Sequence, residues 1–170
     1  IEKLIPVEGA FDHLVSEAIY LTDPEGKGIE IYADRPNGQW QWQGGEVVMK
    51  TLPLDFRDLM ATPGGTLPYT QAPANTVIGH VHLRVGNPAE AERWWNETMG
   101  FDTTAHYGPQ AVFLSTGGYH HHIGANSWQS AGAGRRDEGR SGLAWVALKV
   151  PAERAGTDCE DPWGTVIRMV

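Results

Sequence analysis

The chain has 170 residues, of which 41% are apolar. This is enough to form one sizeable hydrophobic core, either in a single domain or shared between two small modules. Its formal net charge of −8 disfavours nucleic acid and anionic lipid as partners, and no apolar run has the length of a membrane span. The single cysteine, Cys159, excludes a disulfide within the chain and favours a reducing cytoplasm.

The first predicted elements are two strands, residues 15–20 and 29–33, joined by a turn that contains Pro24. In the second strand, Glu30 points to the face opposite Ile29 and Ile31. A carboxylate in mid-strand is costly to bury unless it is paired or bound to a metal; the alternative is an exposed sheet face. Tyr20, on the first strand, is either a core residue or a phenol available to a substrate oxygen.

The clearest pattern covers residues 77–124. A strand at 77–85 is followed by Asn87 as helix N-cap, a helix that ends at Gly100, and three short strands near 103–106, 111–115 and 119–124. This order is β-α-β-β-β, and a further strand at 143–150 is expected to open a second such unit. Trp94 and Trp95 are interpreted first as helix core.

Two internal similarities indicate a repeat. Residues 23–30 match residues 161–168 position for position, and residues 80–85 resemble residues 145–150. Both pairs lie where a module is expected to begin or end.

Five of the seven histidines are His80, His82 and the run 120–122. Strand alternation places His80 and His82 on one face, opposite a core face of aliphatic residues. A lone histidine is more often a structural residue with one hydrogen bond. Several imidazoles on neighbouring strands make a metal pocket an equally good interpretation.

A facial set of two imidazoles and one carboxylate leaves three positions open on Fe(II) or Mn(II), which suits a bidentate substrate together with dioxygen. In the histidine run, a strand cannot point all three rings to one side, so one or two are expected to face the pocket. A neutral imidazole there can accept a proton from a bound hydroxyl. The alternative is a triplet exposed on an edge strand.

Several sequence blocks resemble the vicinal oxygen chelate superfamily of glyoxalase, bleomycin-resistance and extradiol dioxygenase proteins, and most of all its bacterial catechol 2,3-dioxygenases. The blocks are residues 12–20, 23–32, 78–85, 94–101 and 117–124. The resemblance implies an α+β fold in which repeated β-α-β-β-β modules form a cup-shaped mixed sheet around a metal. It divides the chain into the end of an N-terminal module (1–36), a linker (37–76) and a C-terminal domain (77–170).

The resemblance also implies roles for particular residues. His80 matches a metal ligand on the first strand of a module, and Glu30 matches the carboxylate ligand on a last strand. Tyr20 matches a tyrosine that contacts the bound diol, and His121 or His122 matches the acid–base histidine. A second histidine ligand is expected upstream of Ile1.

In the last module, Trp145 and Arg168 stand where a ligand histidine and carboxylate would be. The two modules of the C-terminal domain, residues 77–170, are therefore not expected to form the usual site by themselves.

These features predict a cytoplasmic extradiol dioxygenase that cleaves a catechol-like diol with dioxygen at Fe(II), with Mn(II) as the alternative metal. A small aromatic substrate and dioxygen are the expected partners, a homo-oligomer is allowed, and nucleic acid and membrane are not expected. Two other functions stay open. One is a metal-free, bleomycin-resistance-type module that binds a flat ligand; the other is glyoxalase-type lyase or isomerase chemistry without oxygen.

Overall fold

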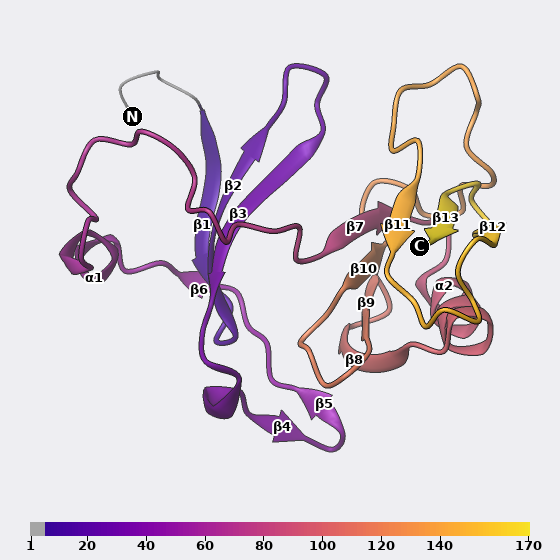
Figure 1. The fold of residues 1–170 in the computed structure, drawn as a ribbon, viewed down its shortest axis with the longest axis horizontal. Coiled ribbons are helices and arrows are strands. Elements are labelled where there is room, and N and C mark those ends of the chain that lie inside the picture. The colour runs from indigo at the N-terminus through magenta and orange to yellow at the C-terminus, as the bar shows by residue number, and fades with distance from the viewer. Residues whose placement is uncertain (1–5) are drawn as a thin grey trace. The chain divides into compact units, whose positions relative to one another are not determined.

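The chain divides into two units, Ile1–Gly79 and His80–Val170, and each is described by itself. The computed structural model describes residues 6–170, coloured along the chain in Figure 1. Strands outnumber helices in both units, as the predicted α+β class requires.

The first unit is built on a four-stranded antiparallel sheet. In the order of the sheet, its strands are β3 (Gly28–Asp34), β2 (Ser16–Thr22), β1 (Val7–Asp12) and β6 (Leu52–Pro53). The two strands predicted at 15–20 and 29–33 are therefore confirmed, with ends shifted by one or two residues.

The predicted linker, residues 37–76, contains several short elements. These are a 3₁₀ turn (Asn37–Gln39), a hairpin of β4 (Trp42–Gln43) and β5 (Glu46–Val47), strand β6, and α1 (Phe56–Ala61). The side chain of Asp55 caps α1 by accepting hydrogen bonds from two backbone N–H groups.

The repeat predicted between residues 23–30 and 161–168 is one turn that occurs twice. The carboxylates of Asp23 and Asp161 each accept two backbone N–H groups. Gly26 donates to the Asp23 carbonyl at 3.0 Å, and Gly164 donates to the Asp161 carbonyl at 3.0 Å. The two glycines have φ of 82° and 83°. The matched sequences therefore encode the same backbone geometry.

Replacing Gly26 with alanine is expected to destabilise the first unit by about 1–2 kcal/mol, because an L-residue is strained at this positive φ. An added Cβ would meet nothing within 4 Å, so the conformation alone causes the effect. Urea unfolding followed by circular dichroism measures the change. Gly28→Ala is the control: its Cβ also meets nothing within 4 Å and its φ is not positive. Equal losses in the two variants would contradict the explanation.

The second unit begins with the predicted β-α-β-β-β order, which the structure confirms (Figure 1). Its elements are β7 (Val81–Arg84), α2 (Pro88–Trp94), β8 (Asp102–Tyr107), β9 (Ala111–Ser115) and β10 (Ile123–Asn126). The sheet order is β7-β10-β9-β8, with β7 and β10 parallel and the other pairs antiparallel.

Helix α2 has the ends that the sequence predicts. The Asn87 side chain accepts a hydrogen bond from the Ala89 N–H at 3.1 Å, and Pro88 occupies the first turn. The helix continues as a π-helical turn, Trp95–Met99, and stops at Gly100, whose φ is 73°.

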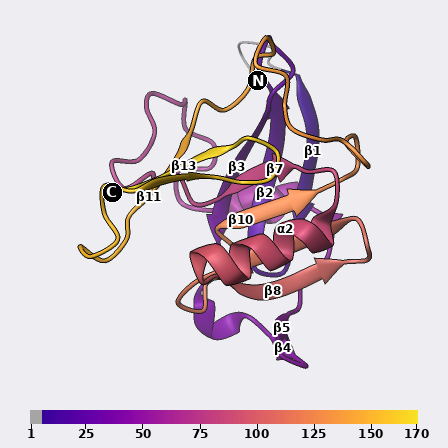
Figure 2. The ribbon, with the colours of Figure 1, turned by 90° about the vertical axis from the view of Figure 1, so that its right-hand side faces the viewer.

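The core of this unit lies between α2 and the sheet, where α2 packs on β9 and β10 (Figure 2). Leu83 and Val85 are buried in it, whereas His82 and Arg84 are exposed. The predicted alternation is therefore confirmed within β7, whereas the strand predicted to begin at residue 77 begins at Val81, and Val77 is exposed.

The end of the chain forms a three-stranded sheet of β11 (Val146–Leu148), β13 (Val166–Met169) and β12 (Asp158–Glu160), in that order. A strand, β11, opens this end of the chain within the predicted range 143–150, and the described stretch 143–170 contains no helix. The guanidinium of Arg168 lies 4.8 Å from the ring centroid of Trp145. Trp145 and Arg168, which stand where the resemblance would place a ligand histidine and a ligand carboxylate, therefore form a cation–π pair.

Among residues 6–170, none of the helices combines the length and the apolar character needed to cross a bilayer.

Candidate metal centre

Three histidines of the second unit gather their side chains in one place. The ligand nitrogens of His80, His82 and His121 all lie within 4.8 Å of one another. The ring centroid of His80 is 4.9 Å from that of His82 and 4.2 Å from that of His121, and the last two are 5.5 Å apart. The parallel pairing of β7 with β10 brings these residues together, because His80 directly precedes β7 and His121 lies just before β10.

The structure corrects the prediction of a strand at 119–124. β10 begins only at Ile123, so His120, His121 and His122 lie in the loop before it. Gly117 and Gly118, with φ of 66° and 73°, turn the chain after β9. Strand alternation therefore does not determine where the three rings point.

His120 is a fully buried neighbour of this group. Its Nδ1 lies 2.8 Å from Nδ1 of His121, and its carbonyl accepts a hydrogen bond from the Thr104 hydroxyl at 2.6 Å. Because Nδ1 of His121 is engaged by His120, Nε2 is the nitrogen of His121 that is suited to bind a metal. His120 thus orients His121.

His122 is half-buried, and its Nδ1 lies 2.9 Å from the Ser115 hydroxyl. Burial, together with the nearby His80, lowers the pKa of His122 below its ordinary value. The ring is consequently neutral near pH 7, which is the form that can accept a proton.

Space for the ring of His82 depends on a glycine. Gly124 is paired with His82 across β7 and β10, and a Cβ added to Gly124 would lie 2.8 Å from Nδ1 of His82. Phe113 is paired with Gly124 on the other side, and its ring centroid is 4.9 Å from that of His121. Gly124 and Phe113 therefore shape the wall of the histidine group.

The first unit holds a separate polar group. The Tyr20 hydroxyl donates to Oε1 of Glu30 at 2.8 Å and lies 2.8 Å from Nε2 of His13. Nδ1 of His13 lies 2.8 Å from the carbonyl oxygen of Lys50. Burial and the carboxylate of Glu30 raise the pKa of Tyr20 well above its ordinary value, so its hydroxyl stays protonated and acts as a donor.

Glu30 lies on the more protected face of β3. Its side chain is half-buried against Tyr20, its cross-strand partner, whereas Ile29 and Ile31 on the other face are exposed. The interpretation of Glu30 as part of an exposed sheet face is therefore wrong. The carboxylate sits where it is hydrogen-bonded.

The predicted site residues fall into these two groups. Tyr20 and Glu30 meet in the first unit, while His80 and His121 meet in the second, with His122 beside them. That Glu30 and His80 bind one ion stays a prediction.

The sequence interpretation missed two residues. His82 was placed on the face of His80 but given no role, although its i, i+2 spacing was a usable signal. His13 lies between β1 and β2, and no local pattern indicated its contact with Tyr20. His106 is an exposed residue of β8.

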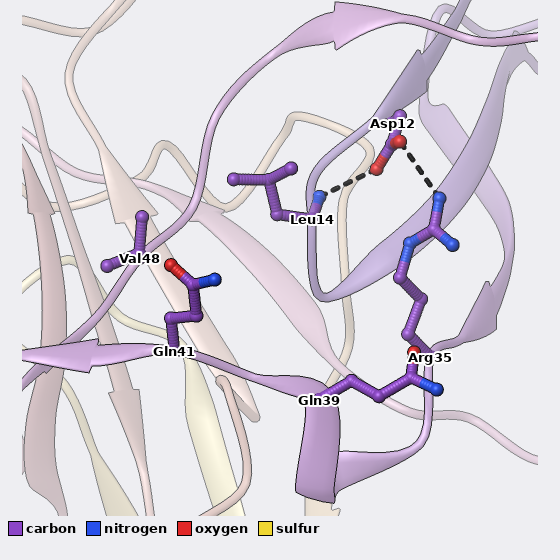
Figure 3. Close-up of a pocket in the computed structure, with 6 residues that line it drawn as sticks. All are labelled: Asp12, Leu14, Arg35, Gln39, Gln41 and Val48. Carbon is purple, nitrogen blue, oxygen red and sulfur yellow. Dashed lines mark hydrogen bonds and ion pairs between the residues drawn. The ribbon is translucent and has the colours of Figure 1, made fainter.

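A small hollow in the first unit is shown in Figure 3. Its lining residues are Asp12, Leu14, Arg35, Gln39, Gln41 and Val48. Arg35 forms ion pairs with Asp12 at 2.8 Å and with Glu17 at 2.7 Å. Its charge is compensated within the protein, and we assign this hollow no catalytic role.

The imidazole nitrogens of His80, His82 and His121 are suited to bind Fe(II), the metal predicted from the sequence. Imidazole nitrogen suits Fe(II), Zn(II), Cu(II) and Ni(II), and three protein ligands leave positions open. The room beside Gly124 and the orientation of His121 by His120 are features that such a site needs.

Residues 77–152 match the family described as the Glyoxalase/Bleomycin resistance protein/Dioxygenase superfamily. The chain resembles this superfamily in sequence, which confirms the resemblance indicated by its motifs.

One curated relative is the catechol-2,3-dioxygenase of Bacillus subtilis (strain 168), which is 43% identical over 145 residues. The matched region is 84% of this chain and 50% of that protein, so the chain spans about half the length of this relative. The solved structure of a lactoylglutathione lyase from Agrobacterium tumefaciens aligns with a TM-score of 0.41 and 12% identity, over 58% of this chain and 94% of the lyase.

Proposed function

We propose that this chain belongs to a metal-dependent extradiol dioxygenase that cleaves the ring of a catechol-like aromatic diol with dioxygen. The observation that carries the proposal is the 43% identity to a catechol-2,3-dioxygenase over 84% of the chain. The histidine group of the second unit supports it, because ring cleavage of this kind needs a metal with open positions. The expected compartment is a reducing cytoplasm, in which Fe(II) stays reduced.

We propose His80 and Glu30 as metal ligands, with Fe(II) as the metal and Mn(II) as the alternative. When bound, the metal supplies the Lewis acidity and redox chemistry on which reaction with dioxygen depends. The membership of His80 in the three-histidine group supports its role. The hydrogen bond from Tyr20 supports Glu30, since ligand carboxylates are commonly held by a second residue.

Side chains of this chain accept the proton of the substrate and form hydrogen bonds with it in the proposed reaction. His122 is the preferred acceptor for the proton of a substrate hydroxyl, because its lowered pKa keeps the ring neutral. His121 is the other candidate. Tyr20 steadies the substrate once its single O–H turns from Glu30 to a substrate oxygen, and its raised pKa keeps the phenol protonated throughout the usual assay range.

Oxygen uptake tests the function. Purified protein is loaded anaerobically with Fe(II), mixed with catechol, and followed with an oxygen electrode and by mass spectrometry of the product. The expected result is one O₂ consumed per diol, with both oxygen atoms in a ring-opened product. Failure to cleave any of a panel of substituted catechols would contradict the proposal. Turnover of a substrate without oxygen would favour a glyoxalase-type lyase or isomerase. Binding of a flat ligand by the metal-free protein would favour a bleomycin-resistance-type binding module.

Tyr20→Phe is expected to lower kcat by about 10- to 100-fold, which corresponds to loss of one hydrogen bond to a charged group. At saturating Fe(II) the metal content should stay close to that of the wild type, because the phenol holds Glu30 but is not itself a proposed ligand. Steady-state oxygen uptake and metal analysis of the same samples measure both quantities. Tyr107→Phe, at an exposed position of β8, is the control and should retain full activity. A Tyr20→Phe variant with wild-type kcat would remove Tyr20 from the mechanism.

A further inference from the structure

We propose that one face of the first unit's sheet is the docking surface for an amphipathic α-helix, which is supplied by polypeptide that precedes residue 1. This outer face consists of the side chains of Val7, Ala10, Ile19, Leu21, Ile29 and Ile31. It lies opposite the face that carries Tyr20 and Glu30. The proposal concerns the assembly of the fold and stands whether or not the protein cleaves catechols.

The outer face is apolar over two complete rows of cross-strand neighbours, to which β1, β2 and β3 each contribute one residue. The first row is Val7, Leu21 and Ile29, and the second row is Ala10, Ile19 and Ile31. Ile31 is 59% exposed, Val7 57% and Ile29 46%. A sheet normally buries its apolar face against another element, and an exposed apolar patch marks an interaction surface. The outer face is therefore a surface that a further element covers.

The second unit shows what covers a sheet of the same register. In both sheets, a middle strand pairs antiparallel with a neighbour on each side, and the register shifts at the same place, Val7/Gly9 in β1 and Thr103/Ala105 in β8. Aligned by register, the matched residues are Ile19 with Val112, Leu21 with Leu114, Ile29 with Ile123, and Ile31 with Ala125. The four residues of the second unit are at most 1% exposed.

Helix α2 covers these four residues, and it defines the chemistry of the proposed partner. The helix packs on β9 and β10. Ala91 is fully buried in this core, and Trp95, four residues later, is 1% exposed. The small residue lets the helix approach the sheet closely, while the aromatic residue fills the space beside it. The helix proposed for the first unit should carry the same kind of apolar stripe, with small and large residues at i, i+4 spacing.

Chain order and length indicate the source of this helix. In the second unit α2 directly precedes the antiparallel strands β8, β9 and β10, so the matching helix precedes β1. The first residue of β1, Val7, lies on the outer face itself. The matched region is only 50% of the Bacillus subtilis relative, so half of that protein lies outside it. That length is ample for one further strand and helix.

Thiol labelling tests the docking surface in two forms of the protein, the 170-residue chain and a longer form that includes the polypeptide ahead of residue 1. Ile31→Cys is labelled with a maleimide, and peptide mass spectrometry follows the reaction at position 31. We expect labelling to be at least about 10-fold slower in the longer form, because the helix must open before the thiol reacts. Glu25→Cys, at an exposed position of the turn between β2 and β3, is the matched control and should react equally fast in both forms.

Ile31→Asp tests the same face through stability. In the longer form it should lower the thermal unfolding midpoint by about 5 °C or more, because a carboxylate would be buried without a partner. In the 170-residue chain the shift should be much smaller, since position 31 is exposed there.

Equal labelling of position 31 in the two forms would overturn the proposal, as would a gene that encodes no amphipathic helix ahead of residue 1. Protection of position 31 in the 170-residue chain would also overturn it. Protection that rises with protein concentration would assign the outer face to a second copy, and protection at every concentration would assign it to another part of the same chain.

Discussion

Replacing His80 with glutamine is expected to weaken Co(II) binding at least about 100-fold and to reduce oxygen uptake with catechol below detection. His80 is a proposed metal ligand, and its ring has the shortest centroid separations within the histidine group, 4.2 Å to His121 and 4.9 Å to His82. Loss of a residue that only orients a ligand costs about 10- to 100-fold in metal affinity, and loss of a ligand itself should cost more. The variant therefore tests the metal centre as a whole.

The measurement pairs Co(II) titration with an oxygen electrode on the same preparations. His106→Gln is the control, because His106 is an exposed residue of β8 and pairs with Glu92 at 3.1 Å. The thermal unfolding midpoint of His80→Gln should stay close to that of the wild type, since the residue is half-buried and directly precedes β7. A correctly folded His80→Gln variant with wild-type Co(II) affinity would show that His80 is not a metal ligand.

Trp95→Ala should destabilise the second unit by about 3–5 kcal/mol, the usual cost of removing a buried tryptophan. Trp95 is 1% exposed and packs against Phe101, with ring centroids 5.0 Å apart. Its neighbour Trp94 is only half-buried at the edge of the same core, so Trp94→Ala is the matched control and should cost much less.

Urea unfolding of the two tryptophan variants, followed by hydrogen exchange in α2 and β9, measures the difference. The outcome also bears on the bleomycin-resistance alternative, in which these indoles would line a ligand cup. A side chain that holds the core cannot also stack on a ligand. If Trp95→Ala were as stable as the wild type but lost affinity for a flat aromatic ligand, the core assignment would be wrong.

Features governed by neighbouring residues were predictable from the sequence. The alternation of β7, the Asn87 cap, the stop at Gly100 and the two aspartate turns all depend on side-chain and backbone preferences over a few positions. The same local information placed His80 and His82 on a polar face. Such features need no knowledge of which strands become neighbours.

The histidine group was only partly predictable, because its assembly depends on contacts distant in sequence. Parallel pairing of β7 with β10 brings His121 against residues about forty positions earlier, and a period of two residues cannot indicate that pairing. Alternation also failed at residues 120–122, where two glycines of positive φ and the Thr104 hydrogen bond set the loop instead. The sequence alone therefore determined the residue types, the turns and the strand faces. Tertiary structure decided which imidazoles meet and that His13 and Glu30 flank the hydroxyl of Tyr20, because long-range strand pairing brings these side chains together.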